Sequence, residues 1–94
     1  MYVNILGKKY KVELLDETRT GGNMGNANRS LQYININKGN AVEQQQDTLM
    51  HEILHIIDGE LKLGLTENTI SRLTVGLFSA GYVHPMLLNL EEDF

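Results

Sequence analysis

The segment His51-Glu52-Ile53-Leu54-His55 places two histidines one helical turn apart, with a glutamate beside the first of them. On a helix that advances about 100° per residue, His51, His55 and Asp58 fall within a sector of roughly 60°, and Glu52 lies at its edge. The opposite side of the same helix carries only apolar residues: Leu49, Met50, Ile53, Leu54, Ile56 and Ile57. The segment therefore predicts an amphipathic helix whose histidines line a polar seam, while the fold buries the other side.

Metal chemistry explains this combination of residues. Two imidazoles at positions i and i+4 can direct their ring nitrogens at one ion about 2.0–2.1 Å away, which suits tetrahedral zinc. Zinc lowers the pKa of a bound water towards about 7, and a carboxylate beside that water can take its proton as hydroxide attacks a carbonyl group. The pattern predicts His51 and His55 as metal ligands and Glu52 as a general base. The alternative is a surface helix on which the three residues coincide, and the amphipathic context favours the metal site.

A zinc site needs a third protein ligand, and Glu67 is the best candidate. It precedes Ile70 and Thr74 by three and seven residues, so it shares one face of a second predicted helix with them. An acid in the first turn of a helix also interacts favourably with the helix dipole, by about 0.3–1 kcal/mol. That role alone could account for a glutamate at this position, and we favour the ligand role.

Three other residues compete for the same role. Asp58 lies one turn beyond His55, but a side chain from the same straight helix has difficulty completing a tetrahedral set, so we interpret it as a supporting or helix-ending group. Glu60 is expected to be solvated, and His84 is expected to lie in a turn before Pro85.

Composition limits the classes of protein to which the chain can belong. Its 94 residues are enough for one domain, residues 1–94, with a core but little surface for separate recognition lobes. The net charge of −4 and the scattered lysines argue against a nucleic-acid partner. The chain has no cysteine, which leaves His, Asp and Glu as metal ligands and is consistent with a reducing cytoplasm. Because no stretch approaches the ~20 apolar residues of a membrane span, we expect a cytoplasmic protein.

The first part of the chain predicts strands. Two β-rich runs, 2–6 and 10–15, surround Gly7-Lys8-Lys9 and predict a hairpin with one buried face. The segment 19–30 is rich in Gly, Asn and Thr and predicts a mobile loop, either functional or a slack connection. Residues 31–37 predict a third strand.

The second part predicts two helices. Asn40 with Glu43 three residues later forms a candidate capping box at the start of the motif helix, and Asp58-Gly59 is its expected end. Apolar residues at three- and four-residue spacing predict a second helix from Thr66 to Gly81. The predicted fold class is α+β, with a small three-stranded sheet packed on the two helices.

Three segments give the chain a resemblance to a known group of proteins. They are Tyr33-Ile34-Asn35-Ile36, the run from Thr48 to Asp58, and Leu65-Thr66-Glu67 opening the second helix. Over most of its length the chain resembles the zincin metallopeptidases, and among them the compact ImmA/IrrE-like and phage-encoded metallopeptidases. The run around the two histidines is specific, whereas the other two segments are weak when taken alone.

The resemblance implies roles for individual residues. It implies one Zn²⁺ per chain held by His51, His55 and Glu67, with Glu52 as the general base. It also implies a minimal zincin-like fold, in which strand 31–37 is an edge that can pair with substrate.

Two functions from different classes follow. The leading hypothesis is a zinc-dependent peptide hydrolase of phage or mobile-element type, whose substrate is a protein or peptide such as a regulatory protein. The alternative is a metal-binding interaction module that keeps the fold without turnover, and a metal-free structural domain is a third, weaker interpretation. The sequence assigns no residue clearly to oxyanion stabilisation. Tyr33, Tyr82 and His84 are candidates, although buried tyrosines more often belong to the core.

Overall fold

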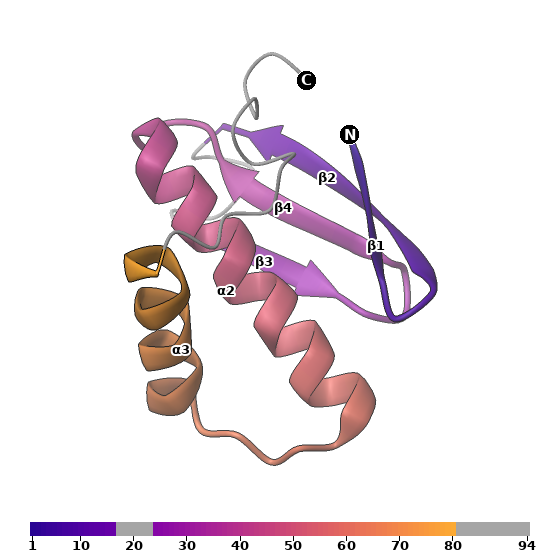
Figure 1. Cartoon of the computed structure of the whole chain (residues 1–94). Coiled ribbons are helices and arrows are strands. Elements are labelled where there is room, and N and C mark those ends of the chain that lie inside the picture. The colour runs from indigo at the N-terminus through magenta and orange to yellow at the C-terminus, as the bar shows by residue number, and fades with distance from the viewer. Residues whose placement is uncertain (17–23, 81–94) are drawn as a thin grey trace.

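The computed structural model of the chain describes residues 1–16 and 24–80. Its elements are, in chain order, β1 (Tyr2–Ile5), β2 (Lys8–Leu15), β3 (Gly25–Asn28), β4 (Tyr33–Asn37), α2 (Val42–Leu61) and α3 (Glu67–Ser79). Figure 1 shows α2 lying across the sheet and α3 packing beside α2. The predicted α+β class is confirmed. Within the described ranges, no helix is long and apolar enough to cross a membrane.

The sheet differs from the prediction in strand number and strand order. Its four strands follow the order β1-β2-β4-β3. The pairs β1/β2 and β3/β4 are antiparallel, whereas β2/β4 is parallel. The prediction of three strands is therefore wrong. The expectation that residues 31–37 form an edge is also wrong, because β4 lies between β2 and β3.

The predicted hairpin is confirmed, with a tighter turn than expected. β1 and β2 are joined by Leu6 and Gly7 alone, and both residues have positive φ angles, 50° and 80°. A two-residue turn with this geometry matches the right-handed twist of paired strands. Lys8 and Lys9, which we expected in the turn, belong to β2.

The strand that sequence patterns miss is β3, which lies inside the predicted loop 19–30. Its sequence, Gly-Asn-Ala-Asn, lacks the β-branched and aromatic residues typical of strands. It forms a strand because it pairs with β4 along its whole length. A Cβ atom on Gly25 would lie 2.6 Å from Thr48 Cγ2 and 2.8 Å from the carbonyl oxygen of Asn35. Only glycine therefore allows β3 to pass this close to α2.

Gly25→Ala should destabilise the protein by about 1–3 kcal/mol, since part of the collision is with backbone that cannot rotate away. The measurement is the free energy of unfolding in urea. Gly76→Ala is the matched control, because a Cβ on Gly76 meets nothing within 4 Å, and alanine in a helix should stabilise it. Equal stability of Gly25→Ala and the parent protein would contradict the close packing of β3 on α2.

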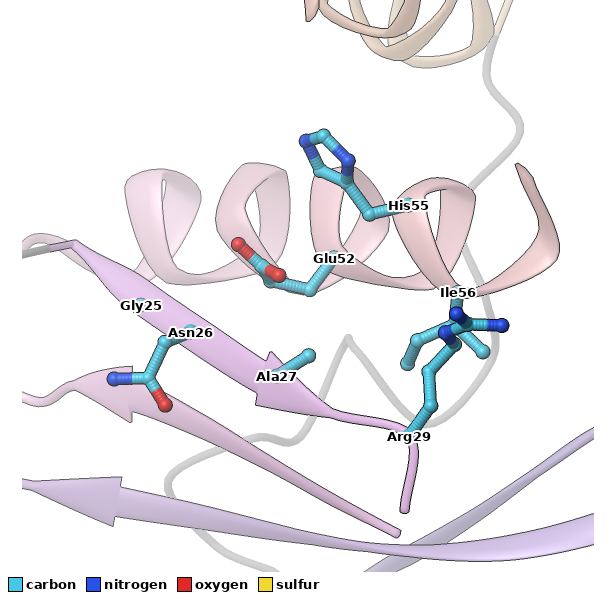
Figure 2. Close-up of a pocket in the computed structure, with 7 residues that line it drawn as sticks. All are labelled: Gly25, Asn26, Ala27, Arg29, Glu52, His55 and Ile56. Atoms are coloured by element: carbon cyan, nitrogen blue, oxygen red, sulfur yellow. The ribbon is translucent and has the colours of Figure 1, made fainter. Parts of the chain in front are cut away.

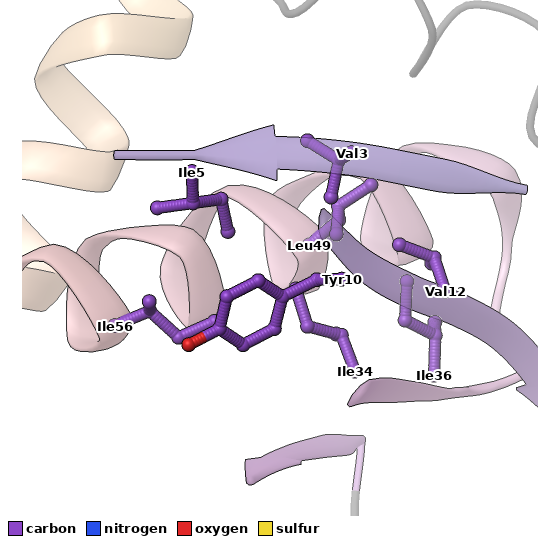
Figure 3. Close-up of a cluster of buried hydrophobic side chains, with 8 residues drawn as sticks. All are labelled: Val3, Ile5, Tyr10, Val12, Ile34, Ile36, Leu49 and Ile56. Carbon is purple, nitrogen blue, oxygen red and sulfur yellow. The ribbon is translucent and has the colours of Figure 1, made fainter. Parts of the chain in front are cut away.

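The hydrophobic core fills the space between the sheet and α2. Its buried residues come from three strands and one helix: Val3, Ile5, Tyr10, Val12, Ile34, Ile36, Leu49 and Ile56. Figure 3 shows these side chains gathered between the strands and the helix. Side chains alternate along a strand, so the face of the sheet that carries Ile34 and Ile36 is the face covered by α2.

α2 begins at Val42, as the sequence predicts, but its N-terminal cap and its end differ from the prediction. Its N-cap is Ala41, with no side-chain hydrogen bond, so the capping box of Asn40 and Glu43 does not form. The Asn40 carbonyl instead accepts a hydrogen bond of 2.8 Å from the Gln45 side chain. At the other end the helix continues through Gly59, and the left-handed residue that ends it is Lys62, with a φ angle of 53°.

The start of α3 agrees with the prediction. Thr66 is its N-cap, and the Thr66 hydroxyl accepts a hydrogen bond of 3.1 Å from the Thr69 backbone N–H. The helix ends at Ser79, before the predicted end at Gly81. Gly81 and residues 17–23 and 82–94 lie outside the described residues.

Candidate metal centre

The reversal of the chain between α2 and α3 brings Glu67 back onto the histidines of α2. The carbonyl of Asp58 accepts a hydrogen bond of 3.1 Å from Leu63 N–H, and its carboxylate accepts one of 2.9 Å from Leu65 N–H. Thr66 then caps the next helix, so Glu67 is its first residue. These contacts fix where α3 starts and therefore where the Glu67 carboxylate can reach.

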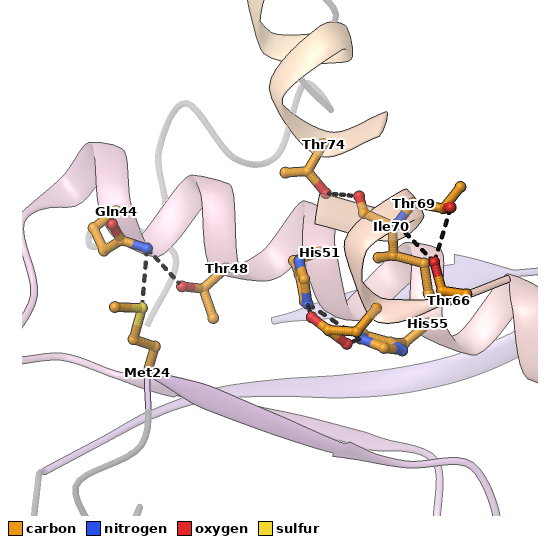
Figure 4. A network of polar contacts seen from close by, with 10 residues as sticks. Met24, Gln44, Thr48, His51, His55, Thr66, Thr69, Ile70 and Thr74 are labelled. Carbon is orange, nitrogen blue, oxygen red and sulfur yellow. Dashed lines mark hydrogen bonds and ion pairs between the residues drawn. The ribbon is translucent and has the colours of Figure 1, made fainter. Parts of the chain in front are cut away.

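The structure brings His51, His55 and Glu67 together. Nε2 of His51 lies 2.6 Å from Glu67 Oε1, and Nε2 of His55 lies 2.6 Å from Glu67 Oε2. The two Nε2 atoms are 3.1 Å apart. Figure 4 shows the two imidazoles side by side on one face of α2. Two helices thus bring ligand-type atoms from three residues within 4.8 Å of one another.

The donor set and its geometry fit a metal ion. Ligand atoms at about 2.0–2.2 Å from a tetrahedral zinc lie about 3.3 Å from one another. The two Nε2 atoms, 3.1 Å apart, are close to this separation, and each of them lies nearer still to a different oxygen of Glu67. The Glu67 side chain is 63% exposed, which leaves one side of the group open to a further ligand. The group could therefore hold a metal ion.

Glu52 lies between two pockets that adjoin this centre. One, which we call the His55 pocket, is lined by residues including Ala27, Arg29, Glu52 and His55, and Figure 2 shows it between β3 and α2. The other, the His51 pocket, is lined by residues including Gln44, Thr48, His51, Glu52 and Glu67. Gly25 and Glu52 line both pockets, so the two pockets are neighbours.

The two glutamates of the site have opposite electrostatic environments. Burial raises the pKa of Glu52 above the ordinary glutamate value; His55 and His51 partly oppose this rise, and Glu67 adds to it. Loss of solvent would also raise the pKa of Glu67. The charges of the two histidines and their hydrogen bonds to its carboxylate outweigh that effect and hold the pKa below its ordinary value. Glu67 is thus suited to remain an anionic ligand, and Glu52 to take up a proton.

The described rival ligands, Asp58 and Glu60, have other partners, and Tyr33, a candidate for oxyanion stabilisation, faces away from the centre. Asp58 is not part of the three-residue group, and its carboxylate binds the connection to α3. Glu60 forms an ion pair of 3.1 Å with Lys8. Tyr33 adjoins the buried Ile34 in β4 and therefore points to the sheet face opposite α2. His84 and Tyr82 lie outside the described residues.

Sequence patterns missed the contribution of β3 and the turn after it. Gly25, Ala27 and Arg29 line the pockets beside Glu52. The composition of their segment had predicted a loop. The signal that could have pointed to them is the glycine content of this segment, since glycine within a strand often marks close approach of another element.

Comparison of the chain with protein-family models, with curated proteins and with solved structures found no match in any of the three. The residues of the site are therefore the basis for inferring what the chain does.

Proposed function

We propose that this chain is a zinc-dependent peptide hydrolase with a zincin-like fold, of phage or mobile-element type, acting in the cytoplasm. The observation that carries the proposal is the position of Glu67, whose carboxylate contacts both histidine Nε2 atoms at 2.6 Å. A helix dipole explains an acid in the first turn, but it does not explain a carboxylate directed at two imidazoles of another helix. Two histidines and a glutamate are a ligand set of catalytic zinc sites that keep a position open.

In this proposal each residue has one task. Zinc, when bound, supplies a Lewis acid that activates water and polarises a carbonyl group. His51, His55 and Glu67 hold the ion. Glu52 takes the proton from the attacking water and gives it to the nitrogen of the departing amine. Its raised pKa makes it a stronger base than an exposed glutamate.

The outer edge of β3 can pair with an extended substrate through backbone hydrogen bonds. The N–H of Asn37 donates a hydrogen bond of 2.8 Å to the carbonyl of Met24. Hydrogen-bonded and non-hydrogen-bonded residue pairs alternate along antiparallel strands. Since Met24 is hydrogen-bonded to β4, the backbone N–H and C=O groups of Gly25 and Ala27 point away from β4. In the part of the chain that the structure describes, β3 has no second neighbour. A peptide paired with it would lie across both pockets and beside Glu52.

We expect the amides of Gly25 and Ala27 to exchange more slowly with solvent when a peptide hydroxamate binds the zinc-loaded protein. Their N–H groups then donate to the ligand, whereas those of Asn26 and Asn28 already point towards β4. Residue-resolved hydrogen exchange with and without the ligand is the measurement. Slowing confined to α2 and α3 would contradict the placement of substrate on β3.

The experiment that tests the function is cleavage of a regulatory protein encoded in the same genome, with zinc and with a chelator. Cleavage that needs zinc supports a hydrolase. Cleavage that survives chelation contradicts the zinc mechanism.

One observation favours the second candidate, a metal-binding interaction module without turnover. No described tyrosine lines either pocket, and Tyr33 points away from the centre, so the described residues supply no phenolic donor for an oxyanion. Tight zinc binding without cleavage of any such regulatory protein would favour this module.

A further inference from the structure

Arg29 places a positive charge in the His55 pocket, beside the proposed general base. It follows β3 immediately after Asn28, and it lies on the same side of the strand as Gly25 and Ala27, which face α2. Figure 2 shows its side chain extending from the end of β3 towards α2, beside Ile56. The guanidinium group is therefore part of the pocket wall and does not extend from the outer face of the sheet.

The helix is shaped to receive this side chain. A Cβ atom on Gly59 would lie 2.7 Å from Arg29 Cζ, 2.8 Å from Nε and 2.9 Å from Nη1. Glycine within a helix is less favourable than alanine, and Gly59 lies inside α2, where it does not serve as a helix end. The missing side chain leaves room for the guanidinium to lie against the helix backbone, while the Arg29 side chain stays 49% exposed and accessible to a ligand.

The donors of this guanidinium are free to meet a ligand. Its ion-pair partner among the described residues is Glu60, at 3.9 Å, which is too long for a hydrogen bond. Both carboxylate oxygens of Glu60 already accept hydrogen bonds from Lys8, at 3.1 and 3.2 Å. A guanidinium carries five N–H donors in a planar array that matches the two oxygens of a carboxylate.

We propose that the His55 pocket selects substrates with an acidic side chain, which Arg29 binds through its carboxylate. This inference rests on the proposed hydrolase function and names its substrate class. β3 runs from the His51 pocket towards Arg29, and antiparallel pairing is the more stable arrangement for an added strand. The acidic residue therefore lies on the N-terminal side of the bond that is cleaved.

The test compares two peptide hydroxamates on the zinc-loaded protein. Both are short acetylated peptides with a C-terminal hydroxamate, identical except for glutamate or glutamine at the position before the terminal residue. Calorimetry at one fixed low salt concentration gives the two dissociation constants. We expect the glutamate peptide to bind about tenfold more tightly, as a charge-assisted hydrogen bond allows.

Three variants assign this preference to the pocket. Arg29→Gln should abolish this preference, so that the two peptides bind with equal affinity, because the glutamate peptide loses more affinity than the glutamine peptide. Arg72→Gln is the matched control, since Arg72 lines a different pocket on α3 and should leave the preference unchanged. Glu60→Gln removes the carboxylate that competes for the guanidinium and should increase the preference. This last variant keeps Arg29 and tests the inference even if Arg29→Gln fails to fold.

The outcomes separate this inference from the proposed function. Equal binding of the two peptides by the parent protein, or a preference that survives Arg29→Gln, overturns the acidic pocket and leaves the metal centre intact. A weaker preference for the glutamate peptide in Glu60→Gln than in the parent protein also overturns the acidic pocket. Failure of both hydroxamates to bind the zinc-loaded protein overturns the proposed function together with the pocket.

Discussion

Glu52→Gln should lower the rate of zinc-dependent peptide hydrolysis by a factor of about 10²–10⁴, the usual contribution of a positioned general base. Glutamine keeps the size and shape of the side chain but cannot accept the proton of the attacking water. Zinc stoichiometry should stay at that of the parent protein, because Glu52 is not one of the three residues that converge as ligands. The measurement is the initial rate of substrate cleavage at saturating zinc.

The raised pKa of Glu52 adds a second readout that does not depend on turnover. Burial disfavours the ionised carboxylate in the folded protein, so above its ordinary pKa this group lowers the free energy of unfolding. Glutamine removes the charge. The zinc-free Glu52→Gln protein should therefore unfold at a higher temperature than the parent at pH 7. This difference should disappear as the pH falls below the ordinary glutamate pKa, where the carboxylate of the parent is protonated in both states.

A matched control separates the base from a general effect of charge. Glu43 lies in the first turn of the same helix and is exposed, so Glu43→Gln should leave the rate of hydrolysis unchanged. Cleavage that persists in Glu52→Gln and in the presence of chelator would come from another mechanism or another protein.

Sequence patterns predicted the elements whose signals are local. The 3.6-residue period around His51 and His55 gave α2, and Thr66 gave the start of α3. The offset of Glu67 from Ile70 placed its carboxylate on the face that meets the histidines. These features depend on residues within a few positions of one another, so a single sequence contains them.

The rest depends on contacts between distant segments. β3 has no strand composition and exists through its pairing with β4 and the close approach of Gly25 to Thr48. Once β3 is present, β4 becomes an inner strand, so the error about the edge follows from the missed strand. Gly59 resembles a helix end in sequence, but it makes room for Arg29 from another part of the chain. Local patterns contain no information about such a contact.

The contrast between Glu67 and Asp58 decides which acid completes the metal centre. Glu67→Ala removes the carboxylate that contacts both Nε2 atoms, and we expect it to weaken zinc binding by more than about 100-fold, beyond the usual effect of an outer-sphere partner. His51→Ala and His55→Ala each remove an imidazole ligand and should abolish stoichiometric zinc binding. Competition with a chromophoric chelator gives the dissociation constants, and the rise in thermal midpoint on adding zinc gives an independent estimate.

Asp58→Ala should have a smaller and different effect. It removes the hydrogen bond from Leu65 N–H that fixes the start of α3, which should lower the free energy of unfolding by about 1 kcal/mol. Zinc binding should weaken by about 10-fold or less, because Asp58 acts on the ligand only by positioning Glu67. If Asp58→Ala instead costs more zinc affinity than Glu67→Ala, the ligand is Asp58 and the assignment of Glu67 is wrong. If neither substitution matters while both histidine variants lose the metal, the third ligand lies outside the described residues, and His84 becomes the residue to replace.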